Sequence, residues 1–159
     1  MSFSHLRNDF PTLCGDNAPA YLDNACVTLK PRQVIDAISD YYGKYPGCGG
    51  RSVHRYGTKV SKLVHESRNT ISKFINSNSP NEVVFTSNAT SSLNQIAKGL
   101  SWNKGDIILT GDREHNSNLV PWLQLQEEQG VEHRVVRSNP DNTFSMENFE
   151  QACADAGDR

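Results

Sequence analysis

The sequence predicts an α/β protein of three layers, in which helices cover both faces of a mostly parallel sheet. In the second half of the 159-residue chain, three short apolar segments alternate with helical segments. Alternation at this spacing is typical of βα units joined by right-handed crossovers. The apolar segments lack the apolar–polar alternation of a half-exposed strand, so we expect both faces of the sheet to be covered.

The expected βα units follow a short capped turn at Ser79–Glu82, where serine and glutamate have the spacing of a capping box. We predict that all strands are parallel and that their carboxyl ends therefore meet at one edge of the sheet. In chain order, the expected strands and helices are strand 83–85, helix 89–100, strand 106–110, helix 118–129, strand 132–137 and helix 145–154.

The first half of the chain predicts helices without strands. A short helix over 2–9 should end before Pro11, because the residue that precedes a proline is disfavoured in helical geometry. Apolar residues at helical spacing predict longer helices over 31–45 and 60–75, separated by the glycine-rich loop Pro46–Arg51. We therefore divide the chain into an N-terminal helical segment, 1–80, and a segment of three βα units, 81–159.

Composition excludes several classes of function. The chain has 36% apolar and 21% charged residues and a net charge of −2, which suits a globular protein and argues against binding to nucleic acid. No apolar run approaches the roughly 18–20 residues that span a bilayer. The first residues lack the apolar core of a signal peptide, so we expect a cytoplasmic protein without membrane contact.

The four cysteines predict neither a metal site nor disulfides. They are widely spaced and contain no C-x-x-C pair, which argues against zinc. A disulfide framework is not expected in an intracellular chain of this size. The cysteines are Cys14, Cys26, Cys48 and Cys153.

The segment Thr86–Ser92 lies between the first expected strand and its helix. A helix N-terminus presents unpaired N–H groups and the positive end of the helix dipole, and Thr90 and Ser91 add hydroxyl donors. This pattern suits a phosphate dianion. Ordinary helix capping is the simpler explanation of the same residues.

The segment Thr110–Asn118 follows the next expected strand and contains His115. An imidazole at this point could stack on a flat heteroaromatic ring or transfer a proton near neutral pH. A histidine in a loop is often without a role, but neighbouring strand ends would place this ring beside the phosphate site. The two segments together predict one ligand-binding site.

Four motifs occur in order along the chain and resemble successive landmarks of the cysteine desulfurases. This group belongs to the class V aminotransferases, which are fold-type I pyridoxal-phosphate enzymes. The resemblance covers about residues 3–149, and its longest stretch, HNSNLVPW, is closest to the branch with sulfur-mobilising desulfurases and selenocysteine lyases. The motifs are Tyr21–Ala25 with Lys30–Pro31, Ser52–Arg55, Val84–Thr90 and Glu114–Trp122.

The resemblance implies that residues 81–159 form the first, incomplete part of the family's large cofactor domain. Thr90 would correspond to the threonine that binds the phosphate of pyridoxal phosphate, with the amides of Ala89, Thr90 and Ser91 around the same oxygens. His115 would stack on the pyridine ring of the cofactor and act as the catalytic residue in this chain.

The resemblance also implies a substrate pocket. Asn24 and Ala25 match the segment that borders it, and His54 and Arg55 match a loop near the active site and the dimer partner. A second histidine that related desulfurases carry after this loop is replaced here by Thr58 or Lys59. Cys26 does not match the persulfide-forming cysteine of the family, which lies later in the chain.

By resemblance, the complete enzyme would convert L-cysteine to L-alanine and pass sulfur, as a persulfide, to an acceptor protein for iron–sulfur cluster assembly. None of the lysines matches the Schiff-base lysine, so we expect this chain to be truncated, inactive alone, and associated as a homodimer or with a missing C-terminal half. The alternatives are a selenocysteine lyase, an aminotransferase-like lyase, or a non-catalytic binding or assembly module. The lysines are Lys30, Lys44, Lys59, Lys62, Lys73, Lys98 and Lys104.

Overall fold

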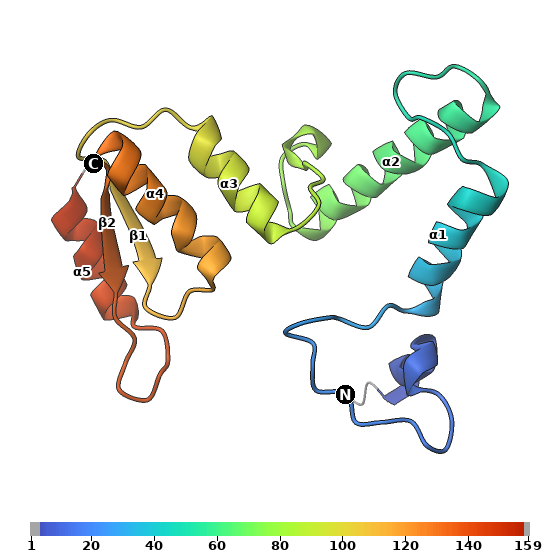
Figure 1. Cartoon of the computed structure of the whole chain (residues 1–159), viewed down its shortest axis with the longest axis horizontal. Coiled ribbons are helices and arrows are strands. Elements are labelled where there is room, and N and C mark those ends of the chain that lie inside the picture. The colour runs from blue at the N-terminus through green and yellow to red at the C-terminus, as the bar shows by residue number, and fades with distance from the viewer. Residues whose placement is uncertain (1–3, 158–159) are drawn as a thin grey trace. The chain divides into compact units, whose positions relative to one another are not determined.

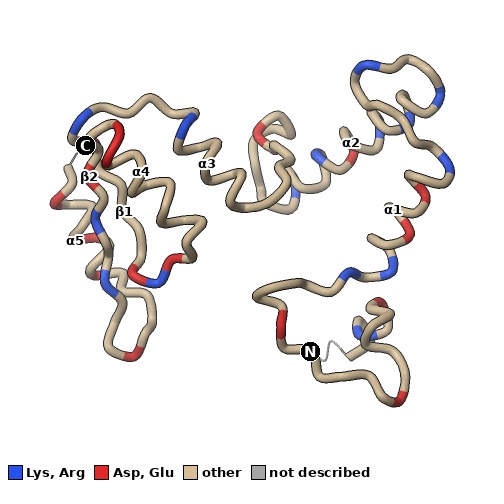
Figure 2. Tube along the Cα trace, in the orientation of Figure 1, with Lys and Arg blue, Asp and Glu red and all other residues tan. Residues whose placement is uncertain are grey.

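The computed structural model describes residues 4–157, and the chain separates into two compact units. The N-terminal unit ends at Val83 and the C-terminal unit begins at Val84. Figure 1 shows helices in the first unit and the strands in the second. Charges of both signs are interspersed along the chain, and no segment carries a long run of one sign (Figure 2).

The N-terminal unit is helical, as the sequence predicts. The helices over 31–45 and 60–75 are confirmed, although the second begins five residues earlier than expected, at Arg55, because His54 caps its first turn. The expected first helix is a 3₁₀ helix over its described part, and residues 2–3 lie outside the described residues. The elements are η1 (Ser4–Asp9), η2 (Pro11–Leu13), α1 (Arg32–Lys44), α2 (Arg55–Phe74) and η3 (Pro80–Glu82).

The glycine-rich loop packs directly against the start of α2. Gly57 is buried, and a Cβ atom built there would lie 2.5 Å from the carbonyl oxygen of Ser52. A Cβ on Gly47 would lie 2.9 Å from the carbonyl carbon of Tyr56. The hydroxyl of Ser61 accepts a hydrogen bond from the Gly50 N–H at 2.8 Å. The glycines thus permit a close approach of two backbones, in addition to the conformational freedom that the sequence suggested.

The N-terminal unit buries little apolar surface. Among its described residues, Val83 is the only buried apolar side chain, whereas Leu22, Val53 and Phe74 are 91%, 98% and 89% exposed. Local contacts hold the helices instead, including the ammonium of Lys59, which lies 3.7 Å from the centre of the Tyr45 ring. The apolar faces that the sequence predicted for these helices are therefore largely uncovered.

The C-terminal unit is the α/β part of the chain. Its strands β1 and β2 are parallel, with Ile107 opposite Glu132 and Gly111 opposite Val136. Figure 1 shows these strands between α4 on one side and α5 on the other, which confirms the predicted layered α/β fold. The elements are α3 (Ala89–Gly99), β1 (Ile107–Gly111), η4 (Asn116–Asn118), α4 (Val120–Gln129), β2 (Glu132–Val136) and α5 (Met146–Ala156).

The expected strand over 83–85 is wrong. In the described chain the sheet has two strands, and no ladder joins 83–85 to either of them. Val83 has an extended backbone, but Val84 is 70% exposed. A strand needs a paired neighbouring strand as well as an apolar sequence, and in the described residues the sheet pairs only β1 with β2.

The core of the C-terminal unit lies between α3, α4 and the sheet. Trp102 packs on this core, with its ring centre 6.3 Å from that of Trp122 in an edge-to-face arrangement, and its indole N–H donates to the Ala97 carbonyl at 2.7 Å. Burying each large apolar side chain of this kind contributes about 1.5–3 kcal/mol. The buried cluster consists of Ala97, Ile108, Trp122, Leu125 and Val131.

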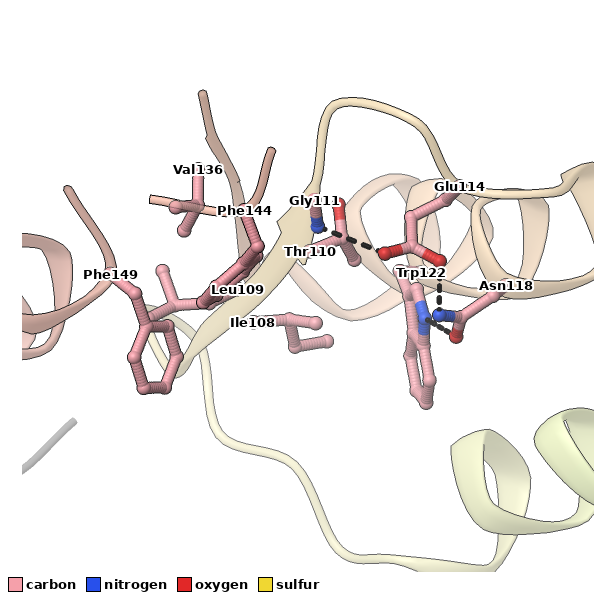
Figure 3. A pocket seen from close by; sticks show the side chains of 10 residues that line it. All are labelled: Ile108, Leu109, Thr110, Gly111, Glu114, Asn118, Trp122, Val136, Phe144 and Phe149. Atoms are coloured by element: carbon pink, nitrogen blue, oxygen red, sulfur yellow. Dashed lines mark hydrogen bonds between the residues drawn. The ribbon is translucent and has the colours of Figure 1, made fainter. Parts of the chain in front are cut away.

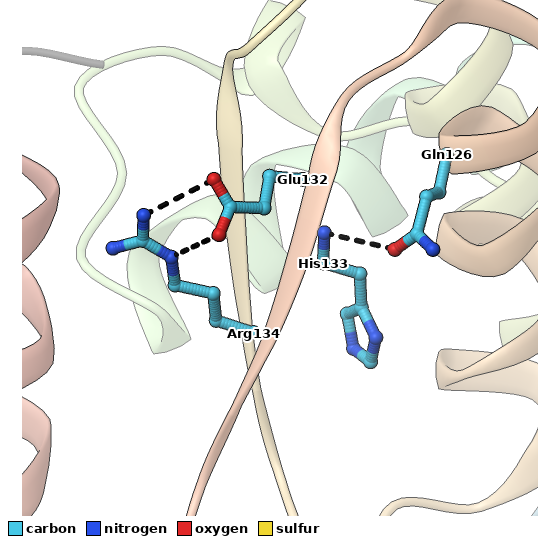
Figure 4. A network of polar contacts seen from close by, with 4 residues as sticks. All are labelled: Gln126, Glu132, His133 and Arg134. Carbon is cyan, nitrogen blue, oxygen red and sulfur yellow. Dashed lines mark hydrogen bonds and ion pairs between the residues drawn. The ribbon is translucent and has the colours of Figure 1, made fainter.

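Side chains of α4 and β2 also join the helix to the sheet. Gln126 accepts a hydrogen bond from the N–H of His133 at 3.1 Å, as Figure 4 shows. On the same strand, Arg134 donates two hydrogen bonds to Glu132 at 2.8 and 3.1 Å.

Among residues 4–157, no helix has the length and apolar character that crossing a membrane requires.

We expect Gly57→Ala to destabilise the N-terminal unit by about 1–3 kcal/mol, because its Cβ would collide with the loop backbone. Gly43→Ala is the matched control. Gly43 lies in α1 with nothing near its Cβ position, so alanine there should stabilise the helix by about 0.5–1 kcal/mol. Hydrogen exchange of the α1 and α2 amides measures both effects, and equal protection in the two variants would contradict the packing argument.

Candidate active site

The N-terminus of α3 is built by its cap. Asn88 has an extended backbone, and its side-chain oxygen accepts the N–H of Ser91 at 2.8 Å. The hydroxyls of Thr86 and Ser92 lie 2.6 Å apart and join the preceding segment to the first turn. Asparagine is among the preferred capping residues, which explains why the helix begins at Ala89.

Two backbone donors at this helix end have no acceptor within residues 4–157. Among the described residues, nothing accepts a hydrogen bond from the N–H of Ala89 or Thr90, and both residues are exposed. The N–H of Ser91, expected to bind phosphate, is instead occupied by the Asn88 cap. The anion donors here are thus two N–H groups and the hydroxyls of Thr90 and Ser91, at the positive end of the helix dipole.

The His115 loop, residues 112–118, is anchored at both ends by one carboxylate. Glu114 accepts the N–H of Gly111 at 3.1 Å with one oxygen and the side-chain amide of Asn118 at 2.8 Å with the other. The oxygen of Asn118 accepts the indole N–H of the buried Trp122 at 3.1 Å. Figure 3 shows this chain of hydrogen bonds running from the end of β1 to the core.

His115 itself is exposed. Its Nδ1 atom accepts the N–H of Ser117 at 3.1 Å and lies 2.8 Å from the Ser117 hydroxyl. Helix η4, which His115 caps, contacts α3. Figure 1 shows α3 and α4 beginning at the end of the unit toward which the β1 arrow points. The histidine and the open end of α3 therefore belong to neighbouring elements of one unit.

A second carboxylate joins the carboxyl ends of the two strands. Asp112, directly after β1, accepts the hydroxyl of Ser138 at 2.5 Å and its N–H at 3.1 Å. These hydrogen bonds stabilise the ionised form, so the pKa of Asp112 lies below its ordinary value of 3.8. The interaction holds the loops after β1 and β2 together.

A cavity of about 240 Å³ lies beneath the His115 loop, at the end of β1 (Figure 3). Its walls are mainly apolar and come from both strands, α4 and the segment around α5. Glu114 and Asn118 form its polar side, and Phe144 and Phe149 its opposite side. The loop that carries His115 thus rests on an apolar surface continuous with the core.

The expected substrate-pocket residues lie in the N-terminal unit. Asn24 and Ala25 are exposed in a turn braced by Tyr21, whose hydroxyl donates to the Val27 carbonyl at 2.5 Å. His54 caps α2, with its Nδ1 atom accepting the Gly57 N–H at 3.5 Å. Arg55 is the first residue of α2 and is exposed. The expected cofactor residues, Ala89–Ser91 and His115, lie in the C-terminal unit, whereas these four lie in the N-terminal unit.

The remaining candidates have local contacts or none. The resemblance places the second histidine of related desulfurases at Thr58 or Lys59, and Lys59 lies over the ring of Tyr45. Cys26 and Cys48 are exposed free thiols, as are the other two cysteines. Within the described part of the chain, no three His, Cys, Asp or Glu side chains gather in a way that would hold a metal ion.

Sequence reasoning missed the residues that position the site. Glu114, Asn118 and Trp122 are spaced four apart, and this spacing across the start of a helix could have indicated that they face one another. Asp112 and Ser138 are 26 positions apart, and nothing local in the sequence joins them. The same holds for the hydroxyl of Thr110 and Nε2 of His133, which lie 2.8 Å apart.

The fold and the site define an α/β protein with an open helix N-terminus beside a histidine-bearing loop at the carboxyl end of a parallel strand. Comparison with known proteins agrees with this class. The family model of Aminotransferase class-V matches residues 20–157. The chain therefore belongs to the aminotransferase class-V family, and the resemblance stated from its motifs is confirmed.

Relatives that match this chain include cysteine desulfurases. A probable cysteine desulfurase of Streptomyces coelicolor is 35% identical over 92% of this chain and 38% of its own length. The apo structure of a cysteine desulfurase from Thermococcus onnurineus NA1 is 32% identical, with a TM-score of 0.82 over 92% of this chain and 36% of that chain. The chain thus spans little more than a third of the length of these relatives.

A more distant solved structure shows the likeness of fold. It is a variant of C-DES with glycine covalently linked to its pyridoxal-phosphate cofactor. It is 23% identical to this chain, with a TM-score of 0.69 over 83% of this chain and 33% of its own.

We expect Asp112→Asn to lower the stability of the C-terminal unit at neutral pH. Because the folded-state pKa of Asp112 is below 3.8, its ionised form stabilises the fold above pH 3.8, and this contribution is lost as the pH falls through the lowered pKa. The difference between wild type and variant should therefore shrink in acid. Urea unfolding followed by tryptophan fluorescence measures it, since both tryptophans lie in this unit. The exposed Asp36→Asn serves as control, and a pH-independent difference would contradict the assignment.

We expect Glu114→Gln to loosen the His115 loop. A glutamine can accept the Gly111 N–H, but its NH₂ group would then face the NH₂ of Asn118, which its contact with Trp122 holds in place. Leaving such donors unpaired in a half-buried position should cost about 1–2 kcal/mol. Urea unfolding and hydrogen exchange of 111–118 measure the effect. Glu150→Gln, on the exposed surface of α5, should match wild type.

Proposed function

We propose that this chain supplies the phosphate-binding and ring-contacting part of a pyridoxal-phosphate-dependent cysteine desulfurase. The observation that carries the proposal is the pairing of two elements in one unit: unpartnered N–H groups at the start of α3, and the exposed His115 ring on the neighbouring loop. Membership of the class V family and the desulfurase relatives support the same reading.

The donors at α3 fit a phosphate group in kind and in charge. The N–H groups of Ala89 and Thr90 lack acceptors among the described residues, and the hydroxyls of Thr90 and Ser91 extend the set. A dianion here would gain charge-assisted hydrogen bonds and a favourable interaction with the helix dipole. The Asn88 cap keeps this first turn ordered before any ligand arrives.

His115 would contact the ring of the cofactor. Its loop is held by Glu114 and Asn118, so the imidazole is presented from a fixed backbone. When bound, pyridoxal phosphate withdraws electrons from the amino-acid substrate, and this is the chemistry that the protein cannot supply by itself. Asn24, Ala25, His54 and Arg55 would border the substrate, L-cysteine, in the assembled enzyme.

The lysines of the C-terminal unit are poorly placed to bind the cofactor covalently. Lys98 and Lys104 are exposed, and Lys98 lies in the last turn of α3, eight residues from Thr90. At about 1.5 Å per residue, this separation is about 12 Å along the helix. We therefore propose that the reactive amine of the complete enzyme comes from outside this unit and that the chain alone does not release alanine from cysteine.

Three further attributes are part of the proposal. An acceptor protein would take the sulfur, with iron–sulfur cluster assembly as its use, and the complete enzyme would be a homodimer. Both follow from the resemblance to desulfurases. A cytoplasmic location would suit the exposed thiols of Cys26 and Cys48, which persist in a reducing compartment.

We expect the chain to bind pyridoxal phosphate weakly and pyridoxal, which lacks the phosphate, more weakly still. Thr90→Val should reduce the affinity for pyridoxal phosphate about fivefold, the effect of losing a hydrogen bond of about 1 kcal/mol in an exposed site. Phosphorus NMR titration measures the binding. Thr70→Val, whose hydroxyl donates to the Glu66 carbonyl in α2, should bind as wild type does.

Reduction with borohydride followed by peptide mass spectrometry tests covalent attachment in the same samples. Low, scattered labelling of exposed lysines is expected. One stoichiometric adduct on Lys98 or Lys104, together with alanine release, would overturn the proposal that the reactive amine lies outside the C-terminal unit. Equal affinity for pyridoxal and pyridoxal phosphate would overturn the phosphate site.

A further inference from the structure

The hydrogen bonds of His115 determine which nitrogen of its ring carries the proton. The N–H of Ser117 points at Nδ1 from 3.1 Å, and a backbone N–H can only donate. Nδ1 must therefore accept, so in the neutral ring the single N–H is at Nε2. The hydroxyl of Ser117, 2.8 Å from the same atom, is then a second donor to it.

The loop keeps Ser117 in this position. The N–H of Asn118 donates to the carbonyl of His115 at 2.8 Å, which closes the turn of η4 around Ser117. Glu114 and Asn118 then fasten the two sides of the turn to β1 and Trp122. The ring, the hydroxyl and the backbone N–H thus form one small assembly on a fixed support.

His54 offers an internal comparison. It also caps a helix through Nδ1, but its contact with the Gly57 N–H is longer, 3.5 Å. Among the described residues, no hydroxyl is hydrogen-bonded to Nδ1 of His54 as that of Ser117 is to Nδ1 of His115. The double contact is therefore a feature of the His115 loop rather than of every capping histidine in this chain.

We propose that Ser117 is a positioning residue that holds the neutral His115 ring in the Nε2–H tautomer. With Nδ1 engaged, the ring can stack and can donate one hydrogen bond from Nε2, but it has no free lone pair with which to act as a base. This assignment of roles rests on the proposed function, because it concerns what the ring presents to the cofactor and substrate. The tautomer itself is a property of the chain without ligand.

Long-range proton–nitrogen NMR of the ¹⁵N-histidine-labelled chain tests the proposal. At about pH 8, above the usual pKa of histidine, the His115 signals should show a protonated Nε2 and an unprotonated Nδ1. His115→Gln identifies these signals among the five histidines. Ser117→Ala keeps the backbone N–H and removes the hydroxyl, so Nε2 should stay protonated while the Nδ1 shift moves away from that of a protonated nitrogen, because one of its two donors is lost.

The control is Asn116→Ala, the neighbouring substitution, which removes no contact to the ring and should leave the His115 shifts unchanged. A protonated Nδ1 in wild type, or shifts unmoved in Ser117→Ala, would overturn the proposal. Addition of pyridoxal phosphate then tests the proposed function separately. The tautomer could be as expected while the Thr90 amide and His115 signals do not shift on addition of pyridoxal phosphate. That result would overturn the proposed cofactor site and leave the role of Ser117 in fixing the tautomer supported.

Discussion

The hydrogen bond from the Trp122 indole to Asn118 is the interaction on which the geometry of the site depends. A buried indole N–H needs an acceptor, and Asn118 provides it. With its oxygen thus engaged, the amide of Asn118 turns its NH₂ group to Glu114, whose other oxygen takes the Gly111 N–H at the end of β1. The packing of one core tryptophan therefore determines the path of the loop that carries His115.

The two units of the chain are stabilised in different ways. The C-terminal unit has a core in which Trp122, Leu125 and Val131 are buried, so hydrophobic burial can offset the entropy of ordering its strands. The described part of the N-terminal unit buries one apolar side chain, Val83, and relies on helical hydrogen bonds and local ring contacts. Amphipathic helices stabilise a fold through the surface they bury, and here that surface is largely exposed.

The parallel arrangement of the two strands places polar residues from both loops at one end of the sheet. Because β1 and β2 run in the same direction, the residues that follow them meet at one end, where Asp112 and Ser138 join the two loops. Helix α3 contacts η4 in the same unit, although the expected strand before α3 is missing. Helix packing, rather than a third strand, brings α3 into contact with the turn that His115 caps.

The sequence by itself determined the helices and the two paired strands, and it supplied the candidate site residues. Helical periodicity and capping are local, so α1, α3 and the end of α4 appear close to where the pattern predicts them. Four motifs in order along the chain, one of which contains His115, indicated the family, which the family model and the matched relatives confirm.

Tertiary structure decided what depends on partners distant in the sequence. The apolar segment 83–85 reads as a strand, but pairing requires a neighbour that periodicity cannot reveal. From the sequence, the N–H of Ser91 is a candidate donor to phosphate. In the folded chain it donates to the side-chain oxygen of Asn88 instead. Ser117 determines which ring nitrogen of His115 carries the proton, because the fold of the loop directs its backbone N–H to Nδ1. A hydrogen bond depends on distance and direction, which follow from folding and not from residue type.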